Sequence, residues 1–197
     1  TDKTFEVITE IAKENNNVKA ILLSRRFGHQ MSLVAGMDQV KDGAIIMMDS
    51  DLQHPPSVIL EMIDKYEKGF EIVYTIRTST EKQNLIRGAM SKVFYYLLNK
   101  TSDINIGIGE ADYRLISPKV VKIFQNQIRE RNQFLRGLFK WVGFKSISVN
   151  FKANKRAAGK TKYSFSTMIK FASSGFTSFS RKPLQLAIYL GVVLSIL

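Results

Sequence analysis

The sequence predicts an α/β domain with a mostly parallel sheet, and three observations support this. Helical and strand-like segments alternate over residues 4–76, in the order that right-handed βαβ crossovers produce. The run from Ala44 to Met48 is continuously apolar, as in a strand buried on both faces of a parallel sheet. With 197 residues the chain is also long enough for one domain with a substantial core.

The first half of the chain supplies the alternation. Residues 4–14 have apolar side chains at a helical period, and Val18 to Leu23 has the pattern of a strand. His29 is expected on the surface of the helix that follows. In order, we expect a helix over residues 29–40, a strand over 44–48, a helix over 57–68 and a strand over 71–76.

The second half is less regular. A helix is expected to begin at Ser117-Pro118, because Pro favours the first helical position. The other expected elements are an amphipathic helix over residues 84–99, a short strand over 110–116, a basic helix over 129–141, a strand over 146–151 and a basic loop over 154–163. The apolar helix over residues 165–179 suits a membrane interface; the alternative is a helix packed in a core.

Charge divides the chain in two. Residues 1–76 hold 8 Lys and Arg against 12 Asp and Glu, whereas residues 77–197 hold 21 against 5. This asymmetry predicts a polyanionic partner for the second half, either nucleic acid or the anionic face of a membrane. The sequence contains no Cys, which excludes disulfides and thiolate metal sites.

The C-terminal end favours the membrane. Residues 183–197 carry no charge, and this segment of 15 residues is shorter than the roughly 20 that a spanning helix needs. We expect it to be the start of a transmembrane helix; the alternative is a buried C-terminal helix. Arg181 and Lys182 precede it, and this enrichment in basic residues places the preceding domain on the cytoplasmic side.

Two carboxylates follow the apolar strand at Ala44 to Met48. Asp49 and Asp51 stand one residue apart, before Pro55-Pro56. In open α/β sheets ligands bind beyond the carboxyl ends of strands, and oxygen ligands at this spacing suit Mg²⁺ with bound phosphates. The alternative is a turn in which both residues cap the next helix.

Several short motifs occur together in an order typical of one family. They are Ser-Arg-Arg-Phe-Gly-His-Gln (24–30), Asp-Ser-Asp-Leu-Gln-His-Pro-Pro (49–56), Ala-Asp-Tyr-Arg-Leu (111–115), Phe-Leu-Arg-Gly-Leu (134–138), Arg-Ala-Ala-Gly-Lys-Thr-Lys-Tyr (156–163) and Ser-Phe-Ser-Arg-Lys-Pro-Leu (178–184). Together they resemble the family 2 polyprenyl-phosphate glycosyltransferases, which include bactoprenol glucosyltransferases and dolichol-phosphate mannose synthases. The resemblance covers essentially the whole chain.

The resemblance implies a GT-A fold, a Rossmann-like nucleotide-sugar domain, over residues 1–152. The family's first strand, which ends in Pro-x-Tyr-Asn-Glu, is missing, so the chain resembles a member truncated at both ends. Residues 153–182 would form the basic loop and interfacial helix, and 183–197 the start of a transmembrane helix. The implied activity is inverting, metal-dependent transfer of a hexose from a UDP- or GDP-sugar to polyprenyl (undecaprenyl) phosphate. It would take place at the cytoplasmic face of the plasma membrane, and homo-oligomers are possible.

The resemblance also assigns site residues. Asp51, with Asp49, would hold Mg²⁺ or Mn²⁺. Asp112 matches the family's acceptor-side acid and is the candidate catalytic residue; its alternative is a structural partner of Arg114. The candidates for nucleotide-sugar binding are Asp49, Ser24, Arg25, Gln53 and His54, of which His54 alternatively stabilises its turn. The acceptor phosphate would be bound by cations that are otherwise solvated surface residues: Arg114, Arg136, Arg156, Lys160 and Lys162.

The acceptor decides what Asp112 must do. A sugar hydroxyl requires a general base, whereas a phosphate monoester, with a second pKa near ~6, is already an anionic nucleophile at pH 7. With a lipid phosphate Asp112 need only position the metal or the acceptor. The remaining alternatives are transfer to a saccharide or cell-wall polymer, a non-catalytic scaffold, and a basic nucleic-acid-binding module. The last is disfavoured, because the basic residues form no known recognition motif.

Overall fold

The structure is a computed structural model, and it describes residues 3–78, 96, 99–100, 107, 109–131, 133–154 and 182–196. The helices expected over 84–99 and 165–179 and the basic loop over 154–163 lie wholly or largely outside these residues. The proposed division of the chain at residues 152 and 182 stays a prediction.

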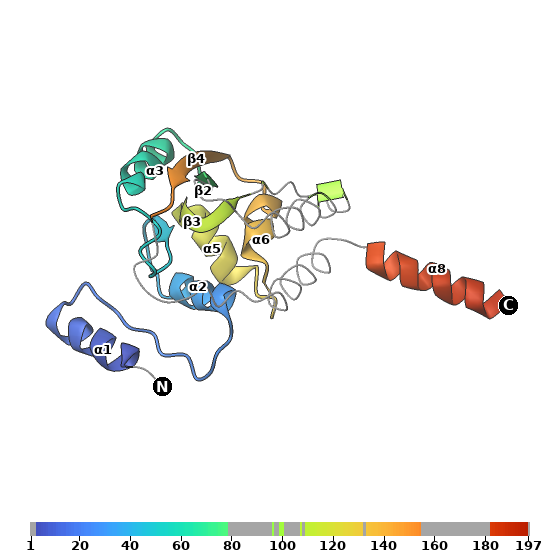
Figure 1. Ribbon diagram of the computed structural model, residues 1–197, viewed down its shortest axis with the longest axis horizontal. Helices are drawn as coiled ribbons and strands as arrows, with labels where there is room; N and C mark the ends of the chain where they lie inside the picture. Colours follow the sequence, from blue (N-terminus) through green and yellow to red (C-terminus); the bar gives the residue numbers. More distant parts are fainter. Residues whose placement is uncertain are drawn as a thin grey trace.

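The described strands form a 4-stranded mixed sheet in the order β1-β3-β2-β4. Figure 1 labels β2, β3 and β4 of this sheet. The strands are β1 (Ile45–Met47), β2 (Ile72–Thr78), β3 (Glu110–Ile116) and β4 (Ser146–Lys152). Both β1 and β2 pair antiparallel with β3, and only β2 and β4 pair in parallel among these strands. The α/β class is therefore confirmed, but the prediction of a mostly parallel sheet is wrong.

The mixed pairing has a simple topological cause. Because β1 and β2 are each antiparallel to β3, they run in the same direction, as a βαβ unit with α3 (Val58–Glu67) between them requires. The alternation in the first half of the chain correctly predicts that orientation. It does not predict that β3, from the second half, inserts between the two strands and converts both of their ladders to antiparallel pairing.

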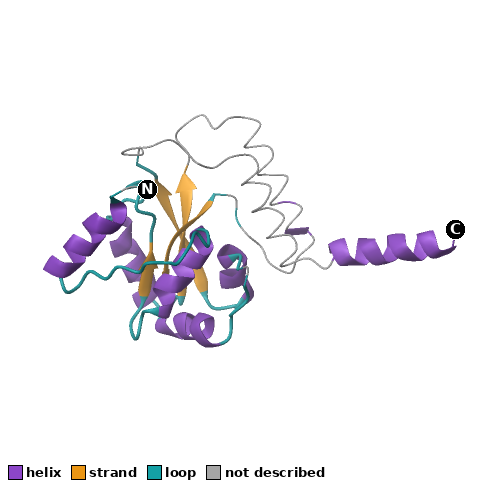
Figure 2. Cartoon of the chain, turned by 90° about the horizontal axis from the view of Figure 1, so that it is seen from below, coloured by secondary structure: helices purple, strands orange, loops and turns teal. Residues whose placement is uncertain are grey.

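Helices cover both faces of this sheet (Figure 2). On one face, α2 (His29–Asp38), α5 (Pro118–Asn126) and α6 (Leu135–Trp141) pack a core with Ile72 and Ile116 of the sheet. On the other, Met62 of α3 packs with sheet residues that include Tyr113 and Leu115. Successive side chains of β3 thus enter different cores. All residues of β3 but one are buried.

The N-terminal segment differs from its prediction in one element. The helix α1 (Thr4–Glu14) forms as expected, although none of its residues is buried. Val18 to Leu23, expected as a strand, is irregular, and its Ile21 and Leu22 are exposed. A strand requires a neighbour for its backbone hydrogen bonds, and no described strand pairs with this segment. This prediction is wrong for the described sheet.

The second half contains one shortened helix and one isolated one. The basic helix expected over 129–141 begins only at Leu135, because buried Ile128 and Phe134 anchor an irregular connection before it. The last helix, α8 (Lys182–Ile196), has 15 residues, and its described side chains are exposed. No helix within the described ranges has both the length and the apolar character needed to cross a membrane.

Candidate functional site

The loop after β1, from Asp49 to Pro56, carries two carboxylates and is fixed in shape by its own His54. The buried His54 ring accepts a hydrogen bond at Nδ1 from the backbone N–H of Asp49, at 3.0 Å. It stacks on Tyr113 of β3, with centroids 4.7 Å apart. Burial lowers the pKa of His54 against the attraction of nearby carboxylates, which favours the neutral ring that accepts this bond. These contacts agree with the alternative prediction for His54, that it stabilises its own turn.

Neighbouring strands hold the same loop from outside. The hydroxyl of Tyr113 donates to the carbonyl oxygen of Pro55 at 2.9 Å. Arg77 Nη1 donates to Gln53 Oε1 at 3.1 Å, and the backbone N–H of Asn154 donates to the carbonyl of Gln53 at 3.1 Å. The side chain of Gln53, a candidate for nucleotide-sugar binding, is therefore engaged with Arg77.

One residue of the loop has a strained backbone. Leu52 has a φ of 60°, in the left-handed region that is unfavourable for a residue with a branched, bulky side chain. Just before it, Asp51 Oδ1 accepts a hydrogen bond from the backbone N–H of Gln53 at 3.2 Å. Strained residues persist where the surroundings over-determine them, and they concentrate at ligand sites. The loop is thus held in one shape around its carboxylates.

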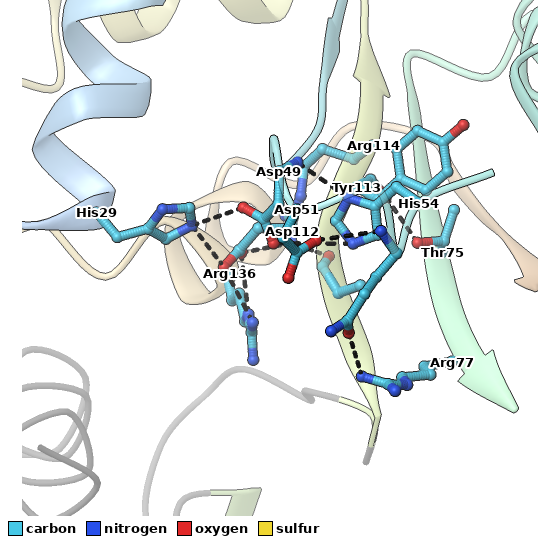
Figure 3. A network of polar contacts seen from close by, with 12 residues as sticks. His29, Asp49, Asp51, His54, Thr75, Arg77, Asp112, Tyr113, Arg114 and Arg136 are labelled. Atoms are coloured by element: carbon cyan, nitrogen blue, oxygen red, sulfur yellow. Dashed lines mark hydrogen bonds and ion pairs between the residues drawn. The ribbon is translucent and has the colours of Figure 1, made fainter. Parts of the chain in front are cut away.

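Asp49 and Asp112 come together at one edge of the sheet. Met47 of β1 pairs with Arg114 of β3, so the antiparallel register carries Asp49 and Asp112 to the same level beyond that pair. Figure 3 shows His29, the first residue of α2, pointing at both. His29 Nε2 lies 3.3 Å from Asp112 Oδ2 and 3.7 Å from Asp49 Oδ1.

Asp112 is the most heavily contacted carboxylate of the site. Arg136 donates to it with two parallel bonds, from Nε to Oδ1 and from Nη2 to Oδ2, each at 3.0 Å. Gln30 Nε2 approaches Oδ2 at 3.5 Å. Burial raises the pKa of this carboxyl, but the charge of Arg136 and the hydrogen bonds from His29 and Arg136 outweigh it and hold the pKa well below its usual range. Asp112 is therefore firmly ionised and a weak proton acceptor.

His29 responds to the same carboxylates. Its hydrogen bond to Asp112 raises the pKa of the imidazole above the ordinary value, although partial burial acts in the opposite direction. The charges of Asp112 and Asp49 add to the rise. A neighbouring imidazole that readily takes a positive charge reduces the repulsion between two acids placed side by side.

Arg114 is enclosed behind Asp112 rather than exposed beside it. Its side chain is only 2% exposed and donates from Nη2 to the carbonyl of Ala111 at 3.0 Å. The guanidinium also lies over the ring of Phe139, 4.7 Å from its centroid. Nη2 is 3.5 Å from Asp112 Oδ1, so the geometry matches the structural-partner alternative for these two residues. Burial lowers the pKa of Arg114 from a very high ordinary value.

A second ion pair docks α6 on β3 next to Asp112. Lys140 Nζ lies 3.2 Å from Oε1 of Glu110, whose side chain is buried. Glu110 and Asp112 alternate onto one face of the strand, and Arg136 and Lys140 lie four residues apart on one face of the helix. Glu110 thus pairs with Lys140 and Asp112 with Arg136. Together the two ion pairs position Arg136.

The remaining predicted residues divide into two groups. Ser24 and Arg25 are exposed in the segment before α2, where the Arg25 guanidinium lies 4.4 Å from the ring centroid of Phe27. Three predicted phosphate-binding residues of the basic loop fall outside the described residues: Arg156, Lys160 and Lys162.

The sequence analysis did not identify two residues that contact Asp112. His29 was expected only on the helix surface, and its half-exposed ring does lie at the surface, but between two carboxylates. Gln30 joins Asp112 to α6, because its Oε1 accepts a hydrogen bond from the backbone N–H of Leu135 at 3.0 Å. The signals in the sequence are their place in the motif of residues 24–30 and at a helix start directly after Gly28, which has a φ of 93°.

Asp49 and Asp51 are the side chains whose chemistry fits a divalent cation. In the part of the chain that the structure describes, no cluster of three or more His, Cys, Asp or Glu side chains is arranged for a metal ion. Mg²⁺ commonly takes one or two protein carboxylates and completes its shell with phosphate and water oxygens. Two partly exposed carboxylates on one fixed loop meet that requirement.

Comparison with known proteins identifies a family and several relatives. A family model described as "Glycosyl transferase family 2" matches residues 1–124. The "Uncharacterized glycosyltransferase YkcC" of Bacillus subtilis (strain 168) is 42% identical over 98% of this chain and 60% of its own length. The "Prophage bactoprenol glucosyl transferase homolog" of Escherichia coli (strain K12) is 34% identical over 98% of this chain and 63% of its own.

A phage protein extends the same similarity. The "Bactoprenol glucosyl transferase" of Shigella phage SfX is 32% identical over 97% of this chain and 62% of its own length. The chain thus spans about three fifths of the length of the curated relatives it matches.

Proposed function

The chain belongs to glycosyl transferase family 2, and on that basis we propose that it transfers a sugar from a nucleotide-sugar to a polyprenyl phosphate. Two relatives with bactoprenol glucosyl transferase in their names support a lipid-phosphate acceptor. The observation that carries the proposal is the meeting of Asp49 and Asp112, bridged by His29, at one edge of the sheet. It joins a loop suited to a metal and a diphosphate with an acid on a separate strand.

The donor would bind over the loop from Asp49 to Pro56. Asp51 and Asp49 would hold Mg²⁺ or Mn²⁺, which when bound neutralises the negative charge of the departing nucleoside diphosphate. The hydrogen bonds of His54 and Tyr113 keep this loop in one shape before the donor arrives, so little reorganisation is needed on binding. Ser24 and Arg25 are further candidates for contacts with the nucleotide.

The transfer itself is a displacement at the anomeric carbon. A phosphate oxygen of the lipid forms the new bond to that carbon, and the bond from the carbon to the diphosphate oxygen breaks. The electron pair of the broken bond leaves on the nucleoside diphosphate, and attack from the opposite face inverts the configuration. The phosphate monoester is already ionised near neutral pH, so the step requires no proton acceptor.

Asp112 suits this acceptor better than a hydroxyl. Its carboxylate is ionised and bound on both oxygens by Arg136, an arrangement that favours positioning over proton abstraction. In the proposed reaction Asp112 holds Arg136 and His29 at the point of transfer. A saccharide acceptor would instead require Asp112 to take a proton, against its lowered pKa.

The reaction is proposed at the cytoplasmic face of the plasma membrane. The excess of basic residues beyond residue 76 supports attraction to an anionic surface. The described side chains of α8 add exposed apolar surface, with Leu184, Ile188 and Val192 among them.

The decisive experiment uses the full-length protein in detergent with undecaprenyl phosphate and a panel of radiolabelled UDP- and GDP-sugars. Label should enter the organic phase with one donor and should be lost when EDTA removes divalent cations. Intact, folded protein that gives no lipid product with any donor would overturn the lipid-acceptor proposal. Transfer to a saccharide in the same preparation would then favour the alternative acceptor.

A further inference from the structure

His29 lies where the two sides of the proposed reaction meet. Its Nε2 is within 4 Å of carboxylates from two different elements, at 3.7 Å from Asp49 on the loop after β1 and 3.3 Å from Asp112 on β3 (Figure 3). It is the first residue of α2 and follows Gly28, whose φ of 93° turns the chain into the helix. Asp49 belongs to the proposed donor side and Asp112 to the proposed acceptor side, so His29 lies between the two.

A phosphate arriving here meets two carboxylates and therefore needs hydrogen-bond donors close to them. Two of the predicted phosphate-binding cations lie in this part of the structure. Arg114 is 2% exposed and enclosed between Ala111 and Phe139, so its guanidinium does not face an incoming ligand. Arg136 directs Nε and Nη2 at Asp112 in a bidentate pair.

The imidazole of His29 is placed differently from both arginines. Its side chain is 49% exposed, which leaves it accessible from solvent. Its two distances to carboxylate oxygens, 3.3 and 3.7 Å, are longer than a well-formed N–H···O bond of about 2.7–3.2 Å. The hydrogen bond from His29 to Asp112 is thus a long one and Asp49 lies farther away still, so a phosphate oxygen is a competent replacement acceptor.

We propose that His29 contacts the acceptor, donating a ring N–H to the phosphate of the polyprenyl phosphate as it approaches the sugar. This inference rests on the proposed function and adds a residue to its acceptor side. Sequence resemblance assigns binding of the acceptor phosphate to Arg114, among other cations. In the structure Arg114 is enclosed and contacts Asp112, so we assign this binding to His29. The nucleotide-sugar is proposed to bind over the loop, whose Asp49 lies 3.7 Å from His29 Nε2, against 3.3 Å for Asp112, so His29 should affect the acceptor more than the donor.

The test is steady-state kinetics of the full-length protein in detergent, with polyprenyl phosphate and nucleotide-sugar varied separately. His29→Ala should raise KM for polyprenyl phosphate by about 10-fold or more, the loss expected for one hydrogen bond to a charged group. KM for the nucleotide-sugar should stay within about 2-fold of the wild-type value. His29→Gln, which keeps an N–H donor near the same position, should recover part of the acceptor affinity.

Ser32→Ala is the matched control, because Ser32 is exposed one turn further along α2 and, among the described residues, its hydroxyl donates only to the carbonyl of Gly28. Circular dichroism and thermal unfolding of each variant identify any that fail to fold. If His29→Ala does not fold, His29→Gln tests the inference in its place. An unchanged acceptor KM in folded variants, or a rise confined to the donor KM, would overturn the inference. Absence of lipid product from the wild-type protein would instead overturn the proposed function, so the two failures are distinguishable.

Discussion

The loop from Asp49 to Pro56 and the cluster around Asp112 meet at one edge of the sheet, but different forces position their carboxylates. In the loop, backbone N–H groups bind side chains a few residues away, as between Asp49 and His54 at 3.0 Å. In the cluster, Asp112 is bound by Arg136 of α6 and approached by Gln30 and His29 of α2. The loop is organised mainly by neutral hydrogen bonds and the cluster mainly by charges.

This difference predicts which region depends on which kind of interaction. A neutral hydrogen bond contributes about 1 kcal/mol net, whereas removing one partner of a buried ion pair costs about 3–5 kcal/mol, because a charge is left without compensation. The loop should therefore tolerate changes in its supports with small losses of stability. The cluster should lose stability with any change of its charges, in addition to any effect on transfer.

The largest expected effect separates the two regions by activity. Asp51→Ala should reduce transfer to lipid by at least about 100-fold, because the departing diphosphate loses the carboxylate that would hold its metal. The melting temperature should change little, since Asp51 is partly exposed. Both are measured on the full-length protein, by label in the organic phase and by thermal unfolding. Unimpaired transfer would remove Asp51 from the proposed metal site.

Removing Arg136 tests the cluster through stability. Arg136→Met should lower the free energy of unfolding by about 2 kcal/mol, less than for a fully buried pair because Arg136 is 21% exposed and Arg114 still faces Asp112. Denaturant titration measures the change. Arg129→Met is the control, because Arg129 makes a similar two-bond pair with Asp38 but in an exposed position, where about 0.5 kcal/mol is expected. Equal losses would contradict the distinction between the two pairs.

The pH dependence of stability should identify Asp112 as a charged support. Its pKa is lower in the folded protein than in the unfolded chain, so its stabilisation is complete above the unfolded value of about 3.9 and is lost as pH falls below it. The difference in melting temperature between wild type and Asp112→Asn should therefore shrink as pH falls below about 4. A difference that stays constant from pH 7 to pH 3 would mean that the charge of Asp112 is not what stabilises the fold. His29, with a raised pKa, acts in the opposite sense, and its contribution is lost as pH rises through its folded value.

The smallest expected effect lies in the supports of the loop. Tyr113→Phe removes the hydroxyl that donates to Pro55 and should cost about 1 kcal/mol of unfolding free energy. Tyr66→Phe is the control, because within the described residues Tyr66 makes no hydrogen bond through its hydroxyl, and this change should be close to neutral. Denaturant titration of both variants measures the difference. A loss for Tyr113→Phe as large as that for Arg136→Met would show that the loop depends on its supports as strongly as the cluster does.

Local features of the sequence determined much of the loop from Asp49 to Pro56, the proposed donor side. A continuous apolar run predicts the strand before Asp49, because this property acts between neighbouring residues. The helix α3 was predicted within one residue at each end for the same reason, and so was the start of α5, with Pro118 at its first position. The strand expected at Val18 to Leu23 failed because a strand also needs a neighbour, which a local pattern does not supply.

Only the tertiary structure decided the cluster around Asp112, the proposed acceptor side. The sequence places Asp112 and Arg114 two residues apart. The insertion of β3 between β1 and β2 determines that Arg114 is enclosed and that Asp112 lies near Asp49. His29 contacts a carboxylate 83 positions further along the chain, and neither the motif of residues 24–30 nor its place at a helix start tells which side chain it meets. Local composition fixes elements because their interactions are short-ranged. Strand order and helix docking bring distant charges together, and these charges give Asp112 its lowered pKa and His29 its place between two acids.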